Sequence, residues 1–134
     1  MSTTNDEHLG KLRRYLKGIE TGAFEDIADL FTPDTTVEQL PNRIYPNGVR
    51  FNASQMSEGF KKGRQLFSSQ SYEIKSYAFH GDGLAAEVLW TGTLAVAFGN
   101  LKVGSQMRAH SAMFLNFENG KIAAQRNYDC FEPW

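Results

Sequence analysis

The sequence lacks the features that mark several large classes of protein. Cys130 is the only cysteine among 134 residues, so no intrachain disulfide can form, which is typical of proteins from a reducing compartment. No run of about 18 apolar residues exists, so we expect no membrane partner. The polar, acidic start, Met1–His8, has neither the basic residues nor the apolar run of a signal peptide. Together these absences predict a cytoplasmic protein.

Net charge is also nearly absent. The chain has 14 Lys and Arg against 15 Asp and Glu, a formal charge of −1. Such a chain gains little from counterion release on a phosphate backbone, so we expect no nucleic-acid partner. It has no Gly-rich phosphate loop, no His/Cys cluster with metal spacing and no Gly-x-Ser-x-Gly elbow. We therefore expect no metal and no cofactor.

Aromatic residues, by contrast, are plentiful. They make up 13% of the chain, with ten Phe, five Tyr and two Trp. Large flat side chains suit a ligand pocket or a subunit interface, and they equally suit a core rich in phenylalanine. The length is that of one domain, and no repeat, linker or low-complexity tract interrupts it. The sequence thus predicts a single domain over residues 1–134.

The order of predicted elements favours an α+β fold. Apolar residues at helical spacing predict three helices, which cover about Thr4–Gly22, Phe24–Phe31 and Asn52–Ser68, with Asn52 and Gln55 as the cap of the third. Stretches rich in β-branched and aromatic residues predict five strands, at Thr35–Leu40, Tyr72–Phe79, Leu84–Phe98, Met107–Glu118 and Lys121–Asp129. Helices first and strands last argue against a parallel sheet.

The strongest local signal is the dipeptide Asn119-Gly120, which predicts a tight hairpin turn. If these two residues form the turn, an unbroken ladder places His110 opposite Asp129, and opposed side chains in an antiparallel pair can touch. A carboxylate beside an imidazole orients the ring and favours its charged form. The pair is therefore a candidate general acid or base.

The face on which this pair lies stays open. In an unbroken ladder, His110 and Asp129 share a face with Phe114 and Asn127, while the other face, which holds Met113, is more apolar. The pair could point into a pocket, or it could lie outside or in a dimer contact. A β-bulge near the end of the hairpin would also shift the register.

Three stretches of the chain resemble the nuclear-transport-factor-2-like superfamily. These are Arg14–Phe31, Thr36–Glu38 and Asn119–Asp129, and the last is most similar to the SnoaL-like group. The superfamily includes ketosteroid isomerases, SnoaL-like polyketide cyclases and limonene epoxide hydrolases. The resemblance implies a cone-shaped, cystatin-like fold, in which three N-terminal helices pack on a curved antiparallel sheet. It also implies a homodimer formed through the outer sheet face.

The resemblance assigns roles to individual residues. Tyr15 matches the tyrosine that hydrogen-bonds the substrate oxyanion in ketosteroid isomerases, whereas Gln39 stands where their aspartate base falls. An amide cannot take a proton from carbon, so that mechanism is disfavoured. Asp129 resembles the working aspartate of cyclases and epoxide hydrolases. The remaining members of the hydrolase triad fall near Glu87 and Leu89, so that triad is absent.

These arguments predict a pocket for a small hydrophobic molecule. The predicted catalytic residues are Asp129, His110 and Tyr15. The predicted ligand-binding residues are Gln39, Met56, Phe60, Leu89, Phe114 and Asn127. Three functions remain open. The first is an isomerase, cyclase or hydrolase that performs acid–base chemistry on an apolar carbonyl compound without a cofactor. The second is non-catalytic binding or sensing of a hydrophobic ligand, and the third is a dimeric interaction module without a ligand.

Overall fold

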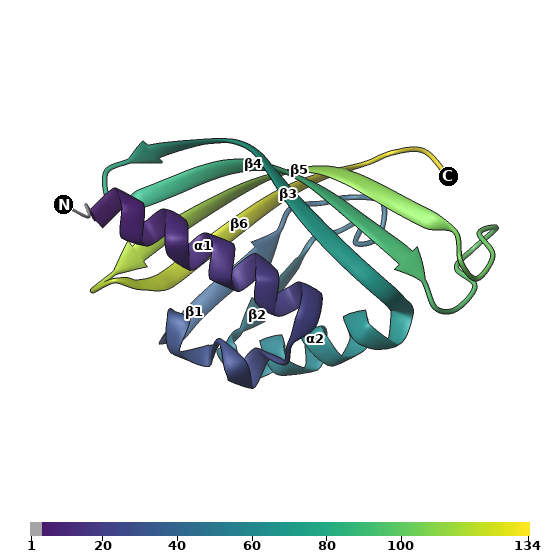
Figure 1. The fold of residues 1–134 in the computed structure, drawn as a ribbon, viewed down its shortest axis with the longest axis horizontal. Coiled ribbons are helices and arrows are strands. Elements are labelled where there is room, and N and C mark those ends of the chain that lie inside the picture. Colours follow the sequence, from purple (N-terminus) through teal and green to yellow (C-terminus); the bar gives the residue numbers. More distant parts are fainter. Residues whose placement is uncertain (1–3) are drawn as a thin grey trace.

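The computed structural model describes residues 4–134, in which two helices and a six-stranded curved sheet form an α+β fold (Figure 1). Met1–Thr3, the start of the polar N-terminal segment, lie outside the described residues. The helices are α1 (Thr4–Thr21) and α2 (Ala53–Leu66). The strands are β1 (Phe31–Gln39), β2 (Val49–Asn52), β3 (Phe67–His80), β4 (Gly83–Leu94), β5 (Gln106–Glu118) and β6 (Lys121–Phe131).

The sheet has the strand order β2-β1-β6-β5-β4-β3. Its last four strands form the predicted antiparallel meander, but β1 pairs with β6 in parallel, so the sheet is mixed rather than purely antiparallel. β2, which we did not predict, pairs with β1 at the sheet edge. Both α1 and α2 lie on the concave side of the sheet, so the sheet and helices face each other across the interior (Figure 1).

The two long helices follow from the sequence pattern. α1 buries Leu12, Tyr15 and Leu16 at spacings of three and four, which places one apolar face against the sheet. The predicted cap of α2 is confirmed, because the Asn52 side chain accepts a bond from the Gln55 backbone N–H and Gln55 Oε1 accepts one from the Asn52 backbone N–H.

The prediction of a helix over Phe24–Phe31, the second of the three predicted helices, is wrong. The segment forms two short 3-10 turns, Phe24–Asp26 and Ala28–Leu30. Between them Ile27 has φ −126° and ψ 11°, outside helical geometry. Its large apolar side chains are still buried, so the pattern predicted burial correctly for Phe24, Ile27, Leu30 and Phe31. Eight residues are too few for a helix that is stable by itself, so tertiary packing decides the backbone conformation.

The hairpin turn at Asn119-Gly120 is confirmed. Both residues have positive φ, 52° and 78°, as a two-residue turn of this kind requires. Glu118 pairs with Lys121 as predicted, and Phe117 pairs with Ile122. The next pair is Asn116 with Ala124, so one extra residue bulges out of β6 at Ala123. Every pair beyond this bulge is shifted by one residue from the predicted register.

The core is divided along the sheet. At one end the concave face packs densely against α1, with Leu84, Leu115 and Ile122 fully buried. At the other end a second cluster, which includes Phe67, Trp90 and Phe131, packs among strand ends and loops. The region between them is not filled by side chains. Over residues 4–134, neither helix combines the length and apolar character that crossing a bilayer requires.

Candidate functional site

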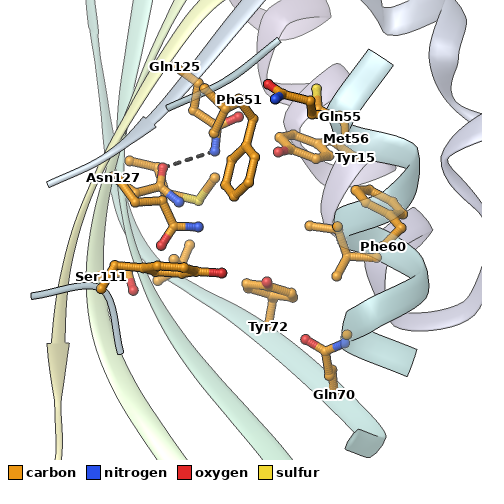
Figure 2. A pocket seen from close by; sticks show the side chains of 18 residues that line it. Tyr15, Phe51, Gln55, Met56, Phe60, Gln70, Tyr72, Ser111, Gln125 and Asn127 are labelled. Atoms are coloured by element: carbon orange, nitrogen blue, oxygen red, sulfur yellow. Dashed lines mark hydrogen bonds between the residues drawn. The ribbon is translucent and has the colours of Figure 1, made fainter. Parts of the chain in front are cut away.

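Two adjoining chambers lie between the concave face of the sheet and the helices. The inner chamber has a volume of about 220 Å³ and the outer one about 480 Å³. The walls of both include Gln39, Phe51, Tyr72, Ser111 and Asn127, so the chambers form one continuous space. The wall is largely apolar, with polar groups at a few positions, which is the usual character of a small-molecule site (Figure 2).

The bulge at Ala123 decides which residues of β6 face this space. Without it, Gln125, Asn127 and Asp129 would share a face with His110. With it, Asp129 pairs with Ser111 and His110 pairs with Cys130. Because paired residues in an antiparallel ladder point to the same side, Gln125, Asn127 and Asp129 join the buried face of β5.

The predicted pairing of His110 with Asp129 is therefore wrong. His110 lies on the outer face, where its side chain is 60% exposed and its Nε2 lies 2.9 Å from Glu132 Oε2. The predicted ligand contacts of Leu89 and Phe114 are also misplaced, since neither lines a chamber. Phe114 packs instead against Tyr128 on the outer face. His110 and Phe114 both belong to the outward-facing residues of β5, and the extra residue in β6 turned Asp129 to the opposite face.

Asp129 is the acidic side chain of the chambers whose pKa is shifted by burial. It lines the outer chamber, and Ser111 Oγ donates a hydrogen bond of 2.6 Å to its Oδ1. Burial raises the pKa of the Asp129 carboxyl, and the bond from Ser111 offsets part of that rise. A general base works best when its pKa lies near the working pH, so this shift is in the direction that base catalysis needs.

Two tyrosine hydroxyls belong to the same space. Tyr15 comes from α1 and lines the inner chamber, and Tyr72 comes from β3 and lines both. Burial raises the pKa of each phenol, and the charge of Asp129 contributes to the shift at Tyr72. A phenol with a raised pKa stays protonated and can donate a hydrogen bond to an oxygen that gains negative charge.

Amide side chains supply most of the other polar groups of the inner chamber. Gln125 Nε2 donates to Asn127 Oδ1 at 2.9 Å (Figure 2). The inner wall also contains the amides of Gln39, Gln55 and Gln70. Over residues 4–134, no acidic or basic side chain belongs to this wall. The outer chamber differs, because Asp129 and the pair Glu58 and Lys62 of α2 contribute charge there.

The remaining predicted residues lie where a ligand could touch them. Gln39, Met56, Phe60 and Asn127 all line the inner chamber, and Gln39 and Asn127 also line the outer one. Tyr15 and Asp129 line adjoining chambers rather than the same one.

Sequence reasoning missed several polar residues of the site, among them Tyr72, Ser111 and Gln125. Ser111 carried a usable signal, because by strand alternation its hydroxyl falls on the apolar face with Met113 and Leu115. In the part of the chain that the structure describes, no group of three or more His, Cys, Asp or Glu side chains is placed to hold a metal ion.

A curved sheet closed by helices over a largely apolar cavity defines a class of small-molecule-binding α+β domains. The family comparison makes this specific, because the SnoaL-like domain family matches residues 12–125. The chain therefore belongs to the SnoaL-like domain family, within the nuclear-transport-factor-2-like superfamily. No curated protein matches the chain.

Solved structures share the fold at low sequence identity. IdmH, a proposed polyketide cyclase from Streptomyces antibioticus, is 14% identical with a TM-score of 0.76, and the match covers 91% of each chain. AclR, a proposed hydroxylase from Streptomyces galilaeus, is 18% identical with a TM-score of 0.74, covering 92% of this chain and 75% of AclR. An epoxide hydrolase of the LEH-like type from M. tuberculosis is 10% identical with a TM-score of 0.72, covering 92% of this chain and 83% of that one.

Proposed function

We propose that this protein catalyses proton transfer on a small, mostly apolar carbonyl compound, as an enzyme of the isomerase, cyclase or hydrolase type, with Asp129 as general base. The observation that carries the proposal is the placement of the Asp129 carboxylate in a largely apolar chamber, held by Ser111. The names of structural relatives, which include a proposed cyclase and an epoxide hydrolase, support the same class of chemistry.

The proposed step uses side chains of this chain alone. Asp129 takes a proton from the carbon next to the carbonyl. The C–H electron pair forms the new C=C bond, and the C=O π pair moves onto the carbonyl oxygen. The Tyr72 hydroxyl donates a hydrogen bond to that oxygen as negative charge develops. Asp129 then returns the proton at another carbon, or the enolate carbon attacks a second carbonyl carbon of the same molecule and Asp129 protonates the alkoxide that forms. Tyr15, deeper in the inner chamber, holds the far end of the substrate.

Exchange of the α-hydrogens of 2-tetralone in D2O tests this proposal, because the ketone is apolar and bicyclic and NMR follows the exchange directly. Wild-type protein is expected to accelerate the exchange over buffer. Exchange at the buffer rate, with 2-tetralone bound, would instead support the second candidate, non-catalytic binding of a hydrophobic ligand. The neutral wall of the inner chamber favours that alternative.

Replacing Ser111 with alanine is expected to move the acid limb of the pH–rate profile to higher pH. The base must be ionised to accept a proton, so the rate rises with pH through the pKa of Asp129. The Ser111 hydrogen bond lowers that pKa, and its loss therefore raises the midpoint. The profile of kcat/KM for 2-tetralone exchange measures the shift. Ser76→Ala, which removes an exposed hydroxyl from β3, should leave the midpoint in place; an equal shift in both variants would argue against a role for Ser111.

The homodimer stays a prediction. The outer face exposes Tyr128, with an exposed fraction of 44%, beside Phe114, and a second copy could cover these large side chains.

A further inference from the structure

The inner chamber contains one polar atom that the fold leaves without a partner. Gln125 is only 2% exposed, and its Oε1 accepts no hydrogen bond from residues 4–134. Its Nε2 donates a hydrogen bond to Asn127 Oδ1 at 2.9 Å. This bond sets the orientation of the amide and leaves Oε1 as the atom without a partner. A buried acceptor without a donor costs free energy, because it has lost its hydration and gained no bond. A ligand that brings a donor to this point would recover that cost.

A donor in the form of a hydroxyl stands next to this acceptor. Tyr15 lines the same chamber, and Gln125 lies close enough to the Tyr15 phenol to influence it. The Tyr15 phenol, kept protonated by burial, can donate a hydrogen bond to an acceptor that a ligand brings. One site thus offers an acceptor from the sheet and a donor from α1, and Figure 2 shows both side chains among those that line the chamber.

The rest of the wall restricts the charge of what can enter. Phe51, Met56 and Phe60 supply apolar surface, and the other polar groups are amides and hydroxyls. Without a charged partner in this wall, a carboxylate or an ammonium group would lose its hydration with no ion pair to replace it. The charges of the site lie in the outer chamber, around Asp129 and the pair Glu58 and Lys62.

We propose that the inner chamber is a recognition site for a neutral alcohol or phenol, whose hydroxyl donates to Gln125 Oε1 and accepts from the Tyr15 hydroxyl. A hydroxyl group fits because it is donor and acceptor at once, whereas a ketone or ether oxygen can only accept. Gln125 is then a specificity-determining residue. The inference rests on the proposed function, since it makes the substrate an elongated molecule with a neutral hydroxyl at one end and its reacting carbon beside Asp129.

Binding of a matched set of bicyclic probes at neutral pH tests the site. Calorimetry would compare 2-naphthol, which donates and accepts, with 2-methoxynaphthalene, which only accepts, and with naphthalene. We expect 2-naphthol to bind at least about tenfold more tightly than either, as one recovered buried hydrogen bond allows. We expect 2-naphthamide, which is neutral, to bind at least about tenfold more tightly than ionised 2-naphthoate of the same shape.

Substitutions then show which side chains cause the preference for 2-naphthol. Gln125→Leu is expected to reduce the ratio of 2-naphthol to 2-methoxynaphthalene affinity to about one. Gln65→Leu, which removes an exposed amide of α2 that lines neither chamber, should keep the ratio. If Gln125→Leu does not fold, Tyr15→Phe provides the second variant and should lower the ratio of 2-naphthol to naphthalene affinity, because the bond that the ligand oxygen accepts is lost. A ratio near one in the wild type would overturn the proposal, because water or Tyr15 itself would then satisfy Oε1. Equal binding of 2-naphthoate would overturn it as well.

These outcomes are separable from the catalytic proposal. Asp129→Asn should leave the 2-naphthol ratio unchanged while it slows 2-tetralone exchange. A lost ratio in Gln125→Leu with no dependence of exchange on Asp129 would leave the hydroxyl site standing and remove the base. Exchange that depends on Asp129, together with a ratio that Gln125→Leu leaves unchanged, would leave the base standing and remove the hydroxyl site.

Discussion

Replacing Asp129 with asparagine is expected to slow the exchange of 2-tetralone α-hydrogens by about a hundredfold to ten-thousandfold in kcat. The amide has nearly the shape of the carboxylate but cannot accept a proton from carbon. The other ionisable side chains of the outer chamber, Glu58 and Lys62, belong to exposed positions of α2, where solvent competes for them. The size of the loss therefore measures how much of the chemistry depends on the partly buried Asp129 carboxylate.

A second carboxylate of the same chamber gives the matched control for this variant. Glu58→Gln removes one negative charge and should change the rate less than about threefold, as expected for a solvated group. Asp129→Asn is expected to fold normally. Its raised pKa means that the ionised carboxylate lowers the free energy of unfolding at pH values above that pKa, and the amide removes this penalty. Equal rates in wild type and Asp129→Asn, with both folded, would exclude Asp129 as the base.

Replacing Tyr72 with phenylalanine is expected to lower kcat for the same exchange by roughly a hundredfold, the usual effect of removing one oxyanion donor. The ring keeps its packing while the hydroxyl is lost. Tyr72 lines both chambers from β3, an edge strand of the sheet, and the charge of Asp129 acts on its phenol. KM should change little, because the bond strengthens mainly as charge develops on the oxygen.

Tyr45→Phe is the control for a hydroxyl in the same walls. Tyr45 also lines both chambers, but it is 38% exposed and belongs to the loop before β2. We expect its loss to affect kcat less than about threefold. If Tyr45→Phe is the slower variant, the oxyanion donor comes from the loop and the role given to Tyr72 is wrong. If both variants exchange at the wild-type rate, neither hydroxyl stabilises the developing charge.

The parts of the fold that depend on local chemistry could be predicted from the sequence. Asn119-Gly120 specifies its own turn, because both residues tolerate positive φ, and the Asn52–Gln55 cap is likewise a contact between near neighbours. The four long strands and both long helices follow from the period of their apolar residues. The resemblance to the SnoaL-like group then gave the family, which the match over residues 12–125 shows.

The parts of the fold that depend on long-range packing could not be predicted from the sequence. The pairing of β1 with β6 joins segments about ninety residues apart, and β2 is a four-residue edge strand that exists through its pairing with β1. For the site, the single extra residue at Ala123 mattered most. Because side chains alternate along a strand, that one residue reversed the face of Asp129 and separated it from His110.

The resulting site is a mixture of predicted and unpredicted residues. Tyr15, Gln39 and Asp129 came from resemblance, and all three line the chambers. The role of Ser111 as hydrogen-bond partner of Asp129 could not be predicted, because it depends on the shifted register. The role of Gln125 could not be predicted either, because its unpaired oxygen is recognised only when the neighbours of its amide are known.

Titration of the Asp129 carboxyl carbon by ¹³C NMR tests the central claim most directly, because it requires no substrate. The account predicts a midpoint above the ordinary aspartate value of 3.8, and a higher one still in Ser111→Ala. A midpoint at or below 3.8 would mean that solvent reaches this carboxylate freely. In that case Asp129 would be an ordinary surface acid, and the chambers would have no base.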